Sequence, residues 1–302
     1  RVVADTPDFL VVRSGPSDTF ASLAAEYLGD PALAPVLEDA NDRGPLAGRL
    51  LVVPKRPLNP GAVDVDGFQV VPILAYHQFT RGRPKSRMQV TATAFEAQMR
   101  YIKDNGYRVI TLRDLEGFLA GERPIPRRAV VVTIDDGYRS TYDIAYPILR
   151  RMGLRATVFV YTDFIGAGLS LTWAQLREMH KSGVIDVQSH SKTHTSLSPN
   201  GAEKPGPAYA RRIEHEIETP HRILAEKLGA PARHFAYPYG DTSEQAVALL
   251  QQRSYTVAAT VQRGANARFT HPLLLRRNMV YSNHGLRDLR KFLKVFARAD
   301  LR

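Results

Sequence analysis

The sequence of 302 residues contains no cysteine. Disulfide bonds and thiolate metal sites are therefore excluded, and any metal bound here must take histidine and carboxylate ligands. No stretch approaches the roughly 18 uninterrupted apolar residues that predict a membrane-spanning helix, so we expect no transmembrane segment. The chain starts at Arg1 and shows no signal-peptide pattern. The lack of cysteine is compatible with an exported protein.

A dense block of one charge is also missing, although the net charge is +11. Lysine and arginine are scattered along the chain, which is typical of a solvated basic surface, and we expect no nucleic-acid partner. Tryptophan occurs once, at Trp173. Its side chain is a candidate substrate contact that could stack on a sugar ring, but we favour packing in the first turn of its helix.

A compact pattern opens the chain. An apolar run at residues 9–13 predicts a short strand, and Asp18-Thr19 is typical of a helix start. A second helix is expected after Pro31, and residues 50–54 predict a closing strand. The predicted order is strand, helix, helix, strand.

This order resembles a LysM domain. The matching segments are Asp18-Thr19, Tyr27-Leu28-Gly29-Asp30-Pro31, Ala40-Asn41 and Leu51-Val52-Val53-Pro54. Such modules bind glycans that contain N-acetylglucosamine, so the resemblance implies a small βααβ glycan-binding domain over residues 1–56. The ligand stays open, and a copy that only spaces or docks the rest of the protein is the alternative.

Residues 57–69 are expected to be a linker because proline and glycine are frequent at its start. From residue 70 to residue 302, strands alternate with helices, which predicts an α/β fold with a parallel sheet or barrel. In such folds the chemistry lies at the C-terminal ends of the strands. Late in the chain we expect a strand over 273–280 and a closing helix over 286–299.

Two adjacent carboxylates follow the most strongly apolar strand. The run Val130-Val131-Val132-Thr133-Ile134 leads directly into Asp135, Asp136 and Gly137. Carboxylates at the mouth of a buried strand are costly unless they are paired, and a metal ion is the usual solution. An ordinary strand followed by an Asp-Gly turn would give the same pattern. This stretch alone leaves the choice open.

Two histidines four positions apart, His190 and His194, follow the strand expected at 184–190. With small hydroxyl neighbours at a strand end, they are better explained as ligands of one metal than as two surface histidines in a loop. Two histidines and one carboxylate leave open positions for water and substrate, which is typical of a catalytic site.

A third turn, Tyr237-Pro238-Tyr239-Gly240, ends another expected strand. Proline and glycine enclose Tyr239 in a rigid turn that could aim its backbone N–H at a developing oxyanion. Tyr237 and Pro238 are candidate substrate contacts. By itself this composition is common in loops.

Together these residues resemble the NodB-like polysaccharide deacetylases, which are carbohydrate esterases of family 4. Residues 133–137 are similar to the family's first motif, usually Thr-Phe-Asp-Asp-Gly, and residues 190–194 to its second. Residues 236–240 are similar to the third, usually Arg-x-Pro-Tyr. The first two motifs lie about 55 residues apart, and the resemblance spans residue 70 to the C-terminal helix. It implies a distorted (β/α) barrel.

The resemblance also implies unequal roles for the two aspartates. Asp135 would be the general base, while Asp136, His190 and His194 would bind a divalent metal. The backbone N–H of Tyr239 would share the oxyanion with that metal. Zinc is our first choice on ligand grounds, and cobalt, nickel, iron and manganese are alternatives.

The sequence departs from the family in two places. Ala236 stands where the family has the arginine that orients the base, and Arg277, from another strand, could supply this guanidinium while Arg276 faces away. The late motif that carries the usual general acid is missing. Tyr76-His77 is similar to an element of the subgroup acting on poly-N-acetylglucosamine, so we assign His77 as the acid, with a structural histidine as the alternative.

We therefore predict a monomeric enzyme of the periplasm or cell envelope that removes N-acetyl groups from an N-acetylglucosamine polymer. An O-acetyl esterase acting on an acetylated glycan is one alternative. A catalytically inactive glycan-binding protein is another, for which the missing motif arginine is the main support. The sequence does not select among peptidoglycan, poly-N-acetylglucosamine and another exopolysaccharide.

Overall fold

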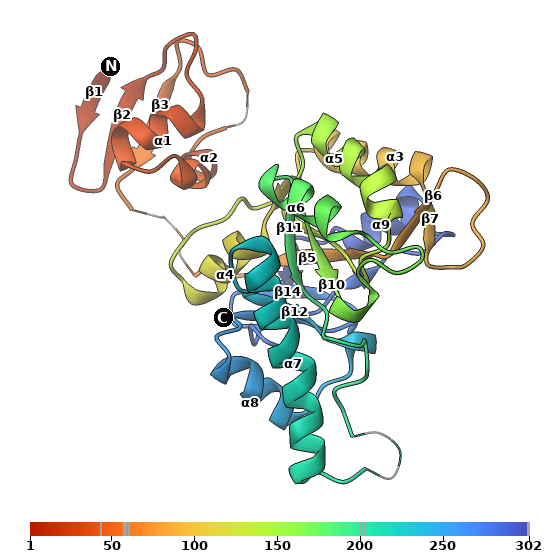
Figure 1. Cartoon of the computed structure of the whole chain (residues 1–302). Helices are drawn as coiled ribbons and strands as arrows, with labels where there is room; N and C mark the ends of the chain where they lie inside the picture. The colour runs from red at the N-terminus through yellow and green to blue at the C-terminus, as the bar shows by residue number, and fades with distance from the viewer. Residues whose placement is uncertain (43, 57–58, 60, 200, 202, 301–302) are drawn as a thin grey trace.

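A computed structural model describes residues 1–42, 44–56, 59, 61–199, 201 and 203–300. The chain forms a small N-terminal unit and a larger barrel-like domain (Figure 1). The expected linker at 57–69 lies partly outside the described residues, at 57–58 and 60. Within the rest of that range, strand β4 (Val63–Asp64) and the start of β5 (Gly67–Tyr76) already belong to the large sheet.

The N-terminal unit has the expected order of elements plus one additional strand at its start. Its elements are β1 (Val2–Asp5), β2 (Phe9–Arg13), α1 (Phe20–Leu28), α2 (Ala34–Ala40) and β3 (Leu50–Pro54). The strands pair antiparallel in the order β1-β2-β3. Thr19 caps α1 in a capping box with Ser22, and Gly29 ends the helix at φ 78°. Strand β1 was not expected, because all four of its residues are exposed and lack alternation.

A curled, mainly parallel sheet is the centre of the larger domain. The strands β5, β9 (Ala129–Ile134), β10 (Ala156–Val160), β11 (Ile185–Ser189), β12 (His234–Ala236) and β13 (Val257–Ala259) are parallel neighbours. Every residue of β9 and β10 is buried, which explains their continuous apolar sequences. The sequence-based prediction of a distorted α/β barrel is thus confirmed.

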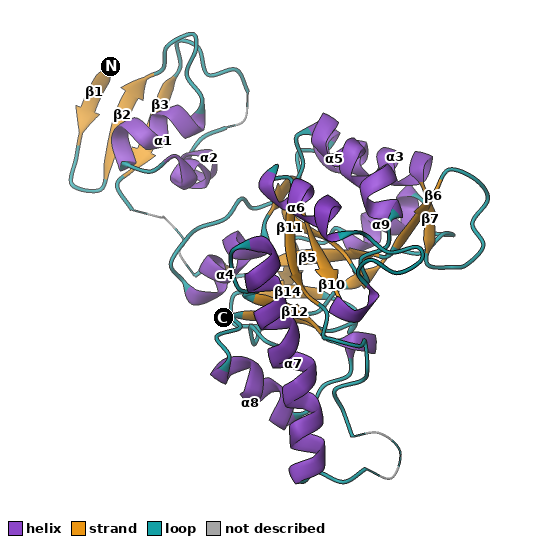
Figure 2. Cartoon of the chain, in the orientation of Figure 1, coloured by secondary structure: helices purple, strands orange, loops and turns teal. Residues whose placement is uncertain are grey.

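Helices surround this sheet (Figure 2). They are α3 (Ala92–Asp104), α4 (Leu112–Ala120), α5 (Tyr146–Met152), α6 (Trp173–Lys181), α7 (Pro207–Leu228), α8 (Glu244–Gln252) and α9 (Leu286–Phe292). Threonine side chains cap α3, α4 and α6. A π-helical turn at Thr141–Ala145 precedes α5, where Pro147 removes one backbone donor from what the sequence predicts as a continuous helix.

The sheet closes through a short segment late in the chain. Ala259 of β13 bridges Leu275, and β15 (Asn278–Met279) pairs in parallel with Leu74 and Ala75 of β5. The prediction of one continuous strand over 273–280 is therefore wrong, because only Leu275 and residues 278–279 pair with neighbouring strands. Residues 275–279 pass from β13 to β5 and make only part of a ladder with each, and Arg277 in this segment reaches Asp135 at the end of β9.

The remaining strands lie outside the row of parallel strands that forms the centre of the sheet. They are β6 (Gln78–Thr80), β7 (Gln89–Thr91), β8 (Arg108–Ile110), β14 (Ala265–Ala267) and β16 (Phe296–Arg298). The closing helix expected over 286–299 is wrong beyond Phe292. Residues 296–298 instead pair antiparallel with residues 67–69 of β5, because a long-range pairing overrides local helix preference.

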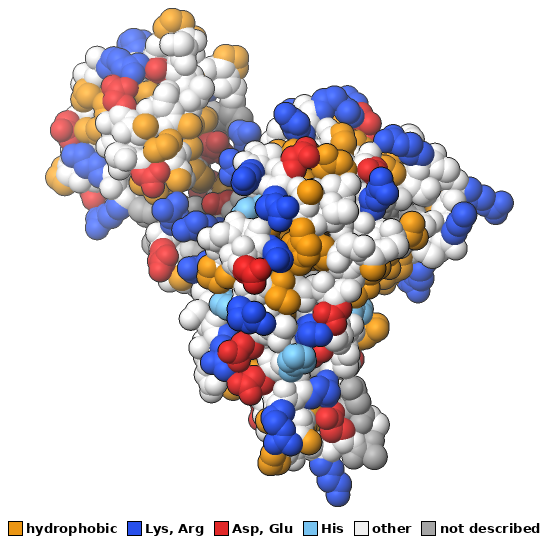
Figure 3. Space-filling view, in the orientation of Figure 1, with side chains coloured by type: hydrophobic (Ala, Val, Ile, Leu, Met, Phe, Trp, Pro, Cys, Tyr) orange, Lys and Arg blue, Asp and Glu red, His pale blue; other side chains and the backbone are white. Residues whose placement is uncertain are grey.

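Two ion pairs join the N-terminal unit to the barrel. Arg108 Nη2 lies 3.6 Å from Glu38 Oε1, and Arg127 Nε lies 3.2 Å from Asp39 Oδ1. The apolar core of the N-terminal unit forms a cluster separate from the two clusters of the barrel. Lysine and arginine are spread over the visible face among acidic side chains, as the sequence suggests (Figure 3). Among the described residues, no helix is long and apolar enough to cross a membrane.

A charged clamp holds α4 against β12. The Glu116 carboxylate accepts hydrogen bonds from His234 Nε2 at 3.2 Å and from Arg233 Nη2 at 2.7 Å. The hydrogen bond with His234 is the main reason that the pKa of Glu116 falls to about 2. Burial lowers the pKa of His234, but Asp186 and Glu116 outweigh burial and raise that pKa above its ordinary value.

We expect Glu116→Gln to lower the free energy of unfolding by about 1–2 kcal/mol, because a partly exposed charged hydrogen bond is lost. The Glu116 contribution is complete above the ordinary pKa of 4.5 and is lost as the pH falls through about 2. The His234 contribution is complete below 6.5 and is lost as the pH rises through its raised pKa. Urea unfolding should therefore show the largest difference between pH 4.5 and 6.5, and a difference that does not change with pH would contradict the clamp.

Candidate active site

The three turns singled out in the sequence meet at the C-terminal edge of the parallel strands. Asp136 follows β9, Ser191 and His194 follow β11, and Tyr239 follows β12. These four residues have left-handed backbone angles, with φ of 75°, 72°, 65° and 60°. Such angles are costly for residues other than glycine and persist where the surrounding structure enforces them, most often at functional sites.

Asp136, His190 and His194 bring one ligand atom each to a common point. The Nε2 atoms of His190 and His194 lie 3.5 Å and 3.3 Å from Asp136 Oδ1, and the three ligand atoms lie within 4.8 Å of one another. Two imidazoles and one carboxylate are a donor set that suits a divalent transition metal. The residues present therefore fit such an ion.

A hydrogen bond on the side of the ring away from Asp136 fixes the orientation of His190. Its Nδ1 lies 2.7 Å from the backbone oxygen of Ala236, so Nδ1 carries the proton and Nε2 is free to face Asp136. Metal-binding histidines are commonly held in this way. Burial would raise the pKa of Asp136, but His190 and His194 outweigh it and hold that pKa far below its usual range.

Asp135 points away from this cluster into a buried ion pair. Its two carboxylate oxygens accept hydrogen bonds from Arg277 Nη1 at 2.8 Å and Nη2 at 2.7 Å. The Arg277 side chain is fully buried, and it also donates to the backbone oxygen of Thr260 and to Thr133 Oγ1. The structure thus places this guanidinium where Ala236 leaves the motif without one.

This ion pair keeps Asp135 ionised. Burial would raise the pKa of the carboxyl group, but the charge and the hydrogen bonds of Arg277 outweigh burial and hold the pKa below its usual range. A bidentate guanidinium also fixes the plane of the carboxylate. Asp135 is therefore an oriented, ionised carboxylate beside Asp136, His190 and His194.

His77 lies at the end of β5 on the same edge, and only 8% of it is exposed. Its Nε2 is 4.0 Å from Asp135 Oδ2, and its buried Nδ1 has no hydrogen-bond partner among the described residues. Burial lowers the pKa of His77, against the opposing charges of Asp135 and Asp136. An unpartnered buried ring nitrogen is costly, so its presence here favours a functional role over a structural one.

The other predicted site residues differ in how far their side chains are exposed. Tyr239 is 64% exposed, and its ring centre lies 4.7 Å from that of His194. Pro238 and Tyr237 are buried, and the Tyr237 hydroxyl donates to the backbone oxygen of Leu273. The Tyr237 side chain therefore belongs to the core in this conformation and does not face a substrate. Trp173 is partly buried against the main core, in accord with the packing interpretation.

Glu216 of α7 supports the histidine loop, and the sequence analysis missed it. Its carboxylate accepts hydrogen bonds from the backbone N–H groups of Lys192 and Thr193 and from the Thr193 hydroxyl. Ser191 Oγ accepts a further bond from the His194 N–H. Glu216 stands in a long amphipathic helix without a local motif, so no sequence signal pointed to it.

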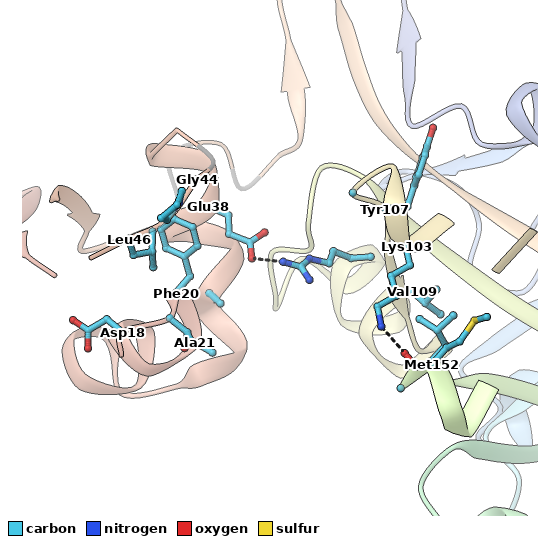
Figure 4. Close-up of a pocket in the computed structure, with 17 residues that line it drawn as sticks. Asp18, Phe20, Ala21, Glu38, Gly44, Leu46, Lys103, Tyr107, Val109 and Met152 are labelled. Carbon is cyan, nitrogen blue, oxygen red and sulfur yellow. Dashed lines mark hydrogen bonds and ion pairs between the residues drawn. The ribbon is translucent and has the colours of Figure 1, made fainter. Parts of the chain in front are cut away.

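A large cleft in the described part of the chain lies away from this site. It has a volume of about 960 Å³ and separates the N-terminal unit from the barrel (Figure 4). Asp18, Phe20 and Leu46 line one side, while Lys103 and Met152 line the other. The barrel residues precede β8 and β10 or lie at their starts, so this cleft faces the end of the barrel opposite the metal ligands.

Comparison with known proteins agrees with this geometry. The family model described as "Polysaccharide deacetylase" matches residues 122–258. A protein of Bacillus subtilis (strain 168), YxkH, whose name assigns it provisionally to the polysaccharide deacetylases, is 29% identical over 198 residues. These residues cover 66% of this chain and 67% of YxkH.

Two further relatives carry more specific names. Poly-β-1,6-N-acetyl-D-glucosamine N-deacetylase of Escherichia coli (strain K12) is 26% identical over 215 residues, which cover 60% of this chain and 32% of that protein. The chain thus matches about a third of the length of this relative. The solved structure of IcaB from Ammonifex degensii has a TM-score of 0.66 and 27% identity, and covers 76% of this chain and 98% of its own. Motifs, geometry and relatives therefore agree in placing a polysaccharide deacetylase domain over residues 122–258 of the chain.

Proposed function

We propose that the protein hydrolyses N-acetyl groups of an N-acetylglucosamine-containing polysaccharide and releases acetate. The observation that carries the proposal is the juxtaposition of a fixed, ionised Asp135 with the ligand set Asp136, His190 and His194. The relatives named as poly-β-1,6-N-acetyl-D-glucosamine deacetylases support this class of polymer.

Asp136, His190 and His194 would hold a divalent cation, which acts when bound as a Lewis acid toward the acetyl carbonyl and lowers the pKa of a nearby water. Zinc is our first choice, and cobalt, nickel, iron and manganese accept the same ligands. The orientation of His190 by the Ala236 carbonyl and the support of His194 by Ser191 keep these side chains in position.

Asp135 accepts the proton of the attacking water in this proposal. Arg277 keeps the carboxylate ionised and oriented, so little reorganisation is needed when the proton moves. The backbone N–H of Tyr239, in its strained turn, is our candidate donor to the oxyanion.

His77 then protonates the amine nitrogen as the carbon–nitrogen bond breaks. It need not carry this proton beforehand, because Asp135 Oδ2 gains one during the attack and lies 4.0 Å from His77 Nε2. A small movement of either side chain would bring the two atoms within hydrogen-bond distance.

The contact between Arg277 and Asp135 removes the main support for an inactive protein, since the guanidinium missing from the motif is supplied from the closing segment. An O-acetyl esterase remains an alternative with the same residues. Acetate release from N-acetylated and O-acetylated oligosaccharides of the same length, with and without a chelator, separates the two activities.

We further propose that residues 1–56 form a LysM-like unit that binds glycan, attached to the deacetylase domain of residues 70–302. Support comes from the capped helix at Thr19 and from the loops on either side of the helices, which line the large cleft. A location in the periplasm or cell envelope and a monomeric state complete the proposal.

The two adjacent aspartates should respond differently to substitution. We expect Asp136→Asn to lose both bound metal and activity, and Asp135→Asn to keep the metal but lose about 10²- to 10⁴-fold in kcat, the usual contribution of a general base. Elemental analysis and acetate release measure the two quantities.

Asp135→Asn also leaves the Arg277 charge buried without a partner, which destabilises proteins by about 3–5 kcal/mol. The double variant Asp135→Asn/Arg277→Met removes both charges and serves as the matched control for folding. An Asp135→Asn protein that deacetylates as fast as the parent would disprove the assigned base.

If His77 is the general acid, the loss of rate on replacing it should depend on the leaving group of the substrate. Loss of a proton donor hinders the departure of an amine but hardly that of a stable phenolate. We therefore expect His77→Gln to slow deacetylation of N-acetylglucosamine oligomers by about 10²-fold and to leave hydrolysis of 4-nitrophenyl acetate almost unchanged. Asp135→Asn, the matched control, should slow both reactions. Equal losses on both substrates for His77→Gln would exclude it as the acid.

A further inference from the structure

A second pocket, of about 380 Å³, opens on the catalytic edge of the barrel. It is formed by segments that follow the C-terminal ends of β5, β13 and β15. Arg277, which holds Asp135, lines its inner wall, while Arg87, Arg263 and Lys291 line the rest. The pocket therefore adjoins the candidate active site through the Arg277 side chain, which binds Asp135, and it carries cationic side chains that the proposed hydrolysis does not use.

The charges in this pocket are poorly balanced. Lys291 lies 3.7 Å from Asp288 in an exposed pair. Within the part of the chain that the structure describes, no carboxylate lies within ion-pair distance of Arg87 or Arg263. Three cations thus face one carboxylate, which leaves a positive potential in a partly enclosed space.

Aromatic rings hold both arginines in place. The Arg87 Cζ atom lies 3.9 Å from the centre of the Tyr281 ring, and the Arg263 Cζ atom lies 5.2 Å from the centre of the Phe292 ring. A guanidinium stacked on a ring keeps the N–H groups at its edge free for an oxygen ligand. These side chains are therefore more restricted than ordinary surface arginines.

His284 contacts both of the rings on which the two arginines stack. Its ring centre lies 5.2 Å from that of Tyr281 and 5.3 Å from that of Phe292. Its Nδ1 accepts a hydrogen bond from the Tyr281 backbone N–H at 3.2 Å. Burial lowers the pKa of His284, Asp288 opposes this, and the charges of Arg263 and Arg87 lower it further. The two arginine–aromatic pairs therefore meet at one imidazole.

We propose that this pocket is a subsite for an anionic group, a carboxylate or a phosphate, carried by the glycan near the sugar that is deacetylated. The proposal rests on the proposed function, and it narrows the substrate class to a polymer with acidic substituents. Arg87 and Arg263 would bind the oxygens of that group through their free edges, while Arg277 remains engaged with Asp135.

The test compares three β-1,6-linked N-acetylglucosamine pentamers: unmodified, O-succinylated and O-phosphorylated. Acetate release gives kcat/KM, and calorimetry gives binding to the full chain. We expect kcat/KM to be about tenfold higher for a charged pentamer, the discrimination typical of a partly exposed charge-assisted contact. Added salt should reduce this preference. The pentamer that is preferred identifies the group as carboxylate, phosphate or either.

Arg87→Gln/Arg263→Gln should abolish the preference, so that charged and neutral pentamers give the same kcat/KM. The matched control is Arg150→Gln/Arg155→Gln, which removes two exposed arginines near the opposite ends of the strands and should keep the preference. Equal kcat/KM for all pentamers in the parent protein, or a preference that survives in the first variant, would overturn the subsite. If no pentamer is deacetylated, the proposed function fails, and the calorimetric preference still decides whether the anion subsite exists.

Discussion

The buried ion pair between Asp135 and Arg277 is the interaction on which the rest of the site depends. Taking both charges out of water costs several kcal/mol per ion, and only good geometry with additional hydrogen bonds offsets that cost. Here two short bonds join the pair, and Thr260 and Thr133 satisfy further donors of the guanidinium. Because Arg277 lies in the segment that closes the sheet, one interaction both joins this segment to the end of β9 and fixes the plane of the Asp135 carboxylate.

The candidate metal ligands are positioned in another way. Strained backbone angles near them are stabilised by hydrogen bonds from a neighbouring helix. Asp136 and His194 adopt left-handed angles, and the hydrogen bonds of Glu216 to the loop after β11 hold that loop in shape. The catalytic edge therefore combines rigid ligands with a rigid base, so most of the ordering entropy is lost during folding and not during binding of substrate.

The sequence predicted the parts of this site that are local in the chain. The turns after β9, β11 and β12 have recognisable compositions, so their residues could be named beforehand. The pairing of Arg277 with Asp135 could be suggested only by resemblance, because it depends on how residues 275–279 cross the barrel. Strand β16 and the support by Glu216 depend on long-range contacts that leave no periodic signal. Strand β1 pairs locally with β2, but its four exposed residues show no alternation. The place of Tyr237 in the sequence motif also did not reveal that its side chain is buried in the core.

The connection between the two units has a consequence for how the protein handles a long polymer. The ion pairs of Arg108 with Glu38 and of Arg127 with Asp39 are exposed, and such pairs contribute about 0–1 kcal/mol each. Their strength falls as the Debye length shortens with added salt. The N-terminal unit is then a tethered body whose effective concentration near the barrel is set by its covalent connection. Added salt would therefore loosen the coupling between the N-terminal unit and the barrel.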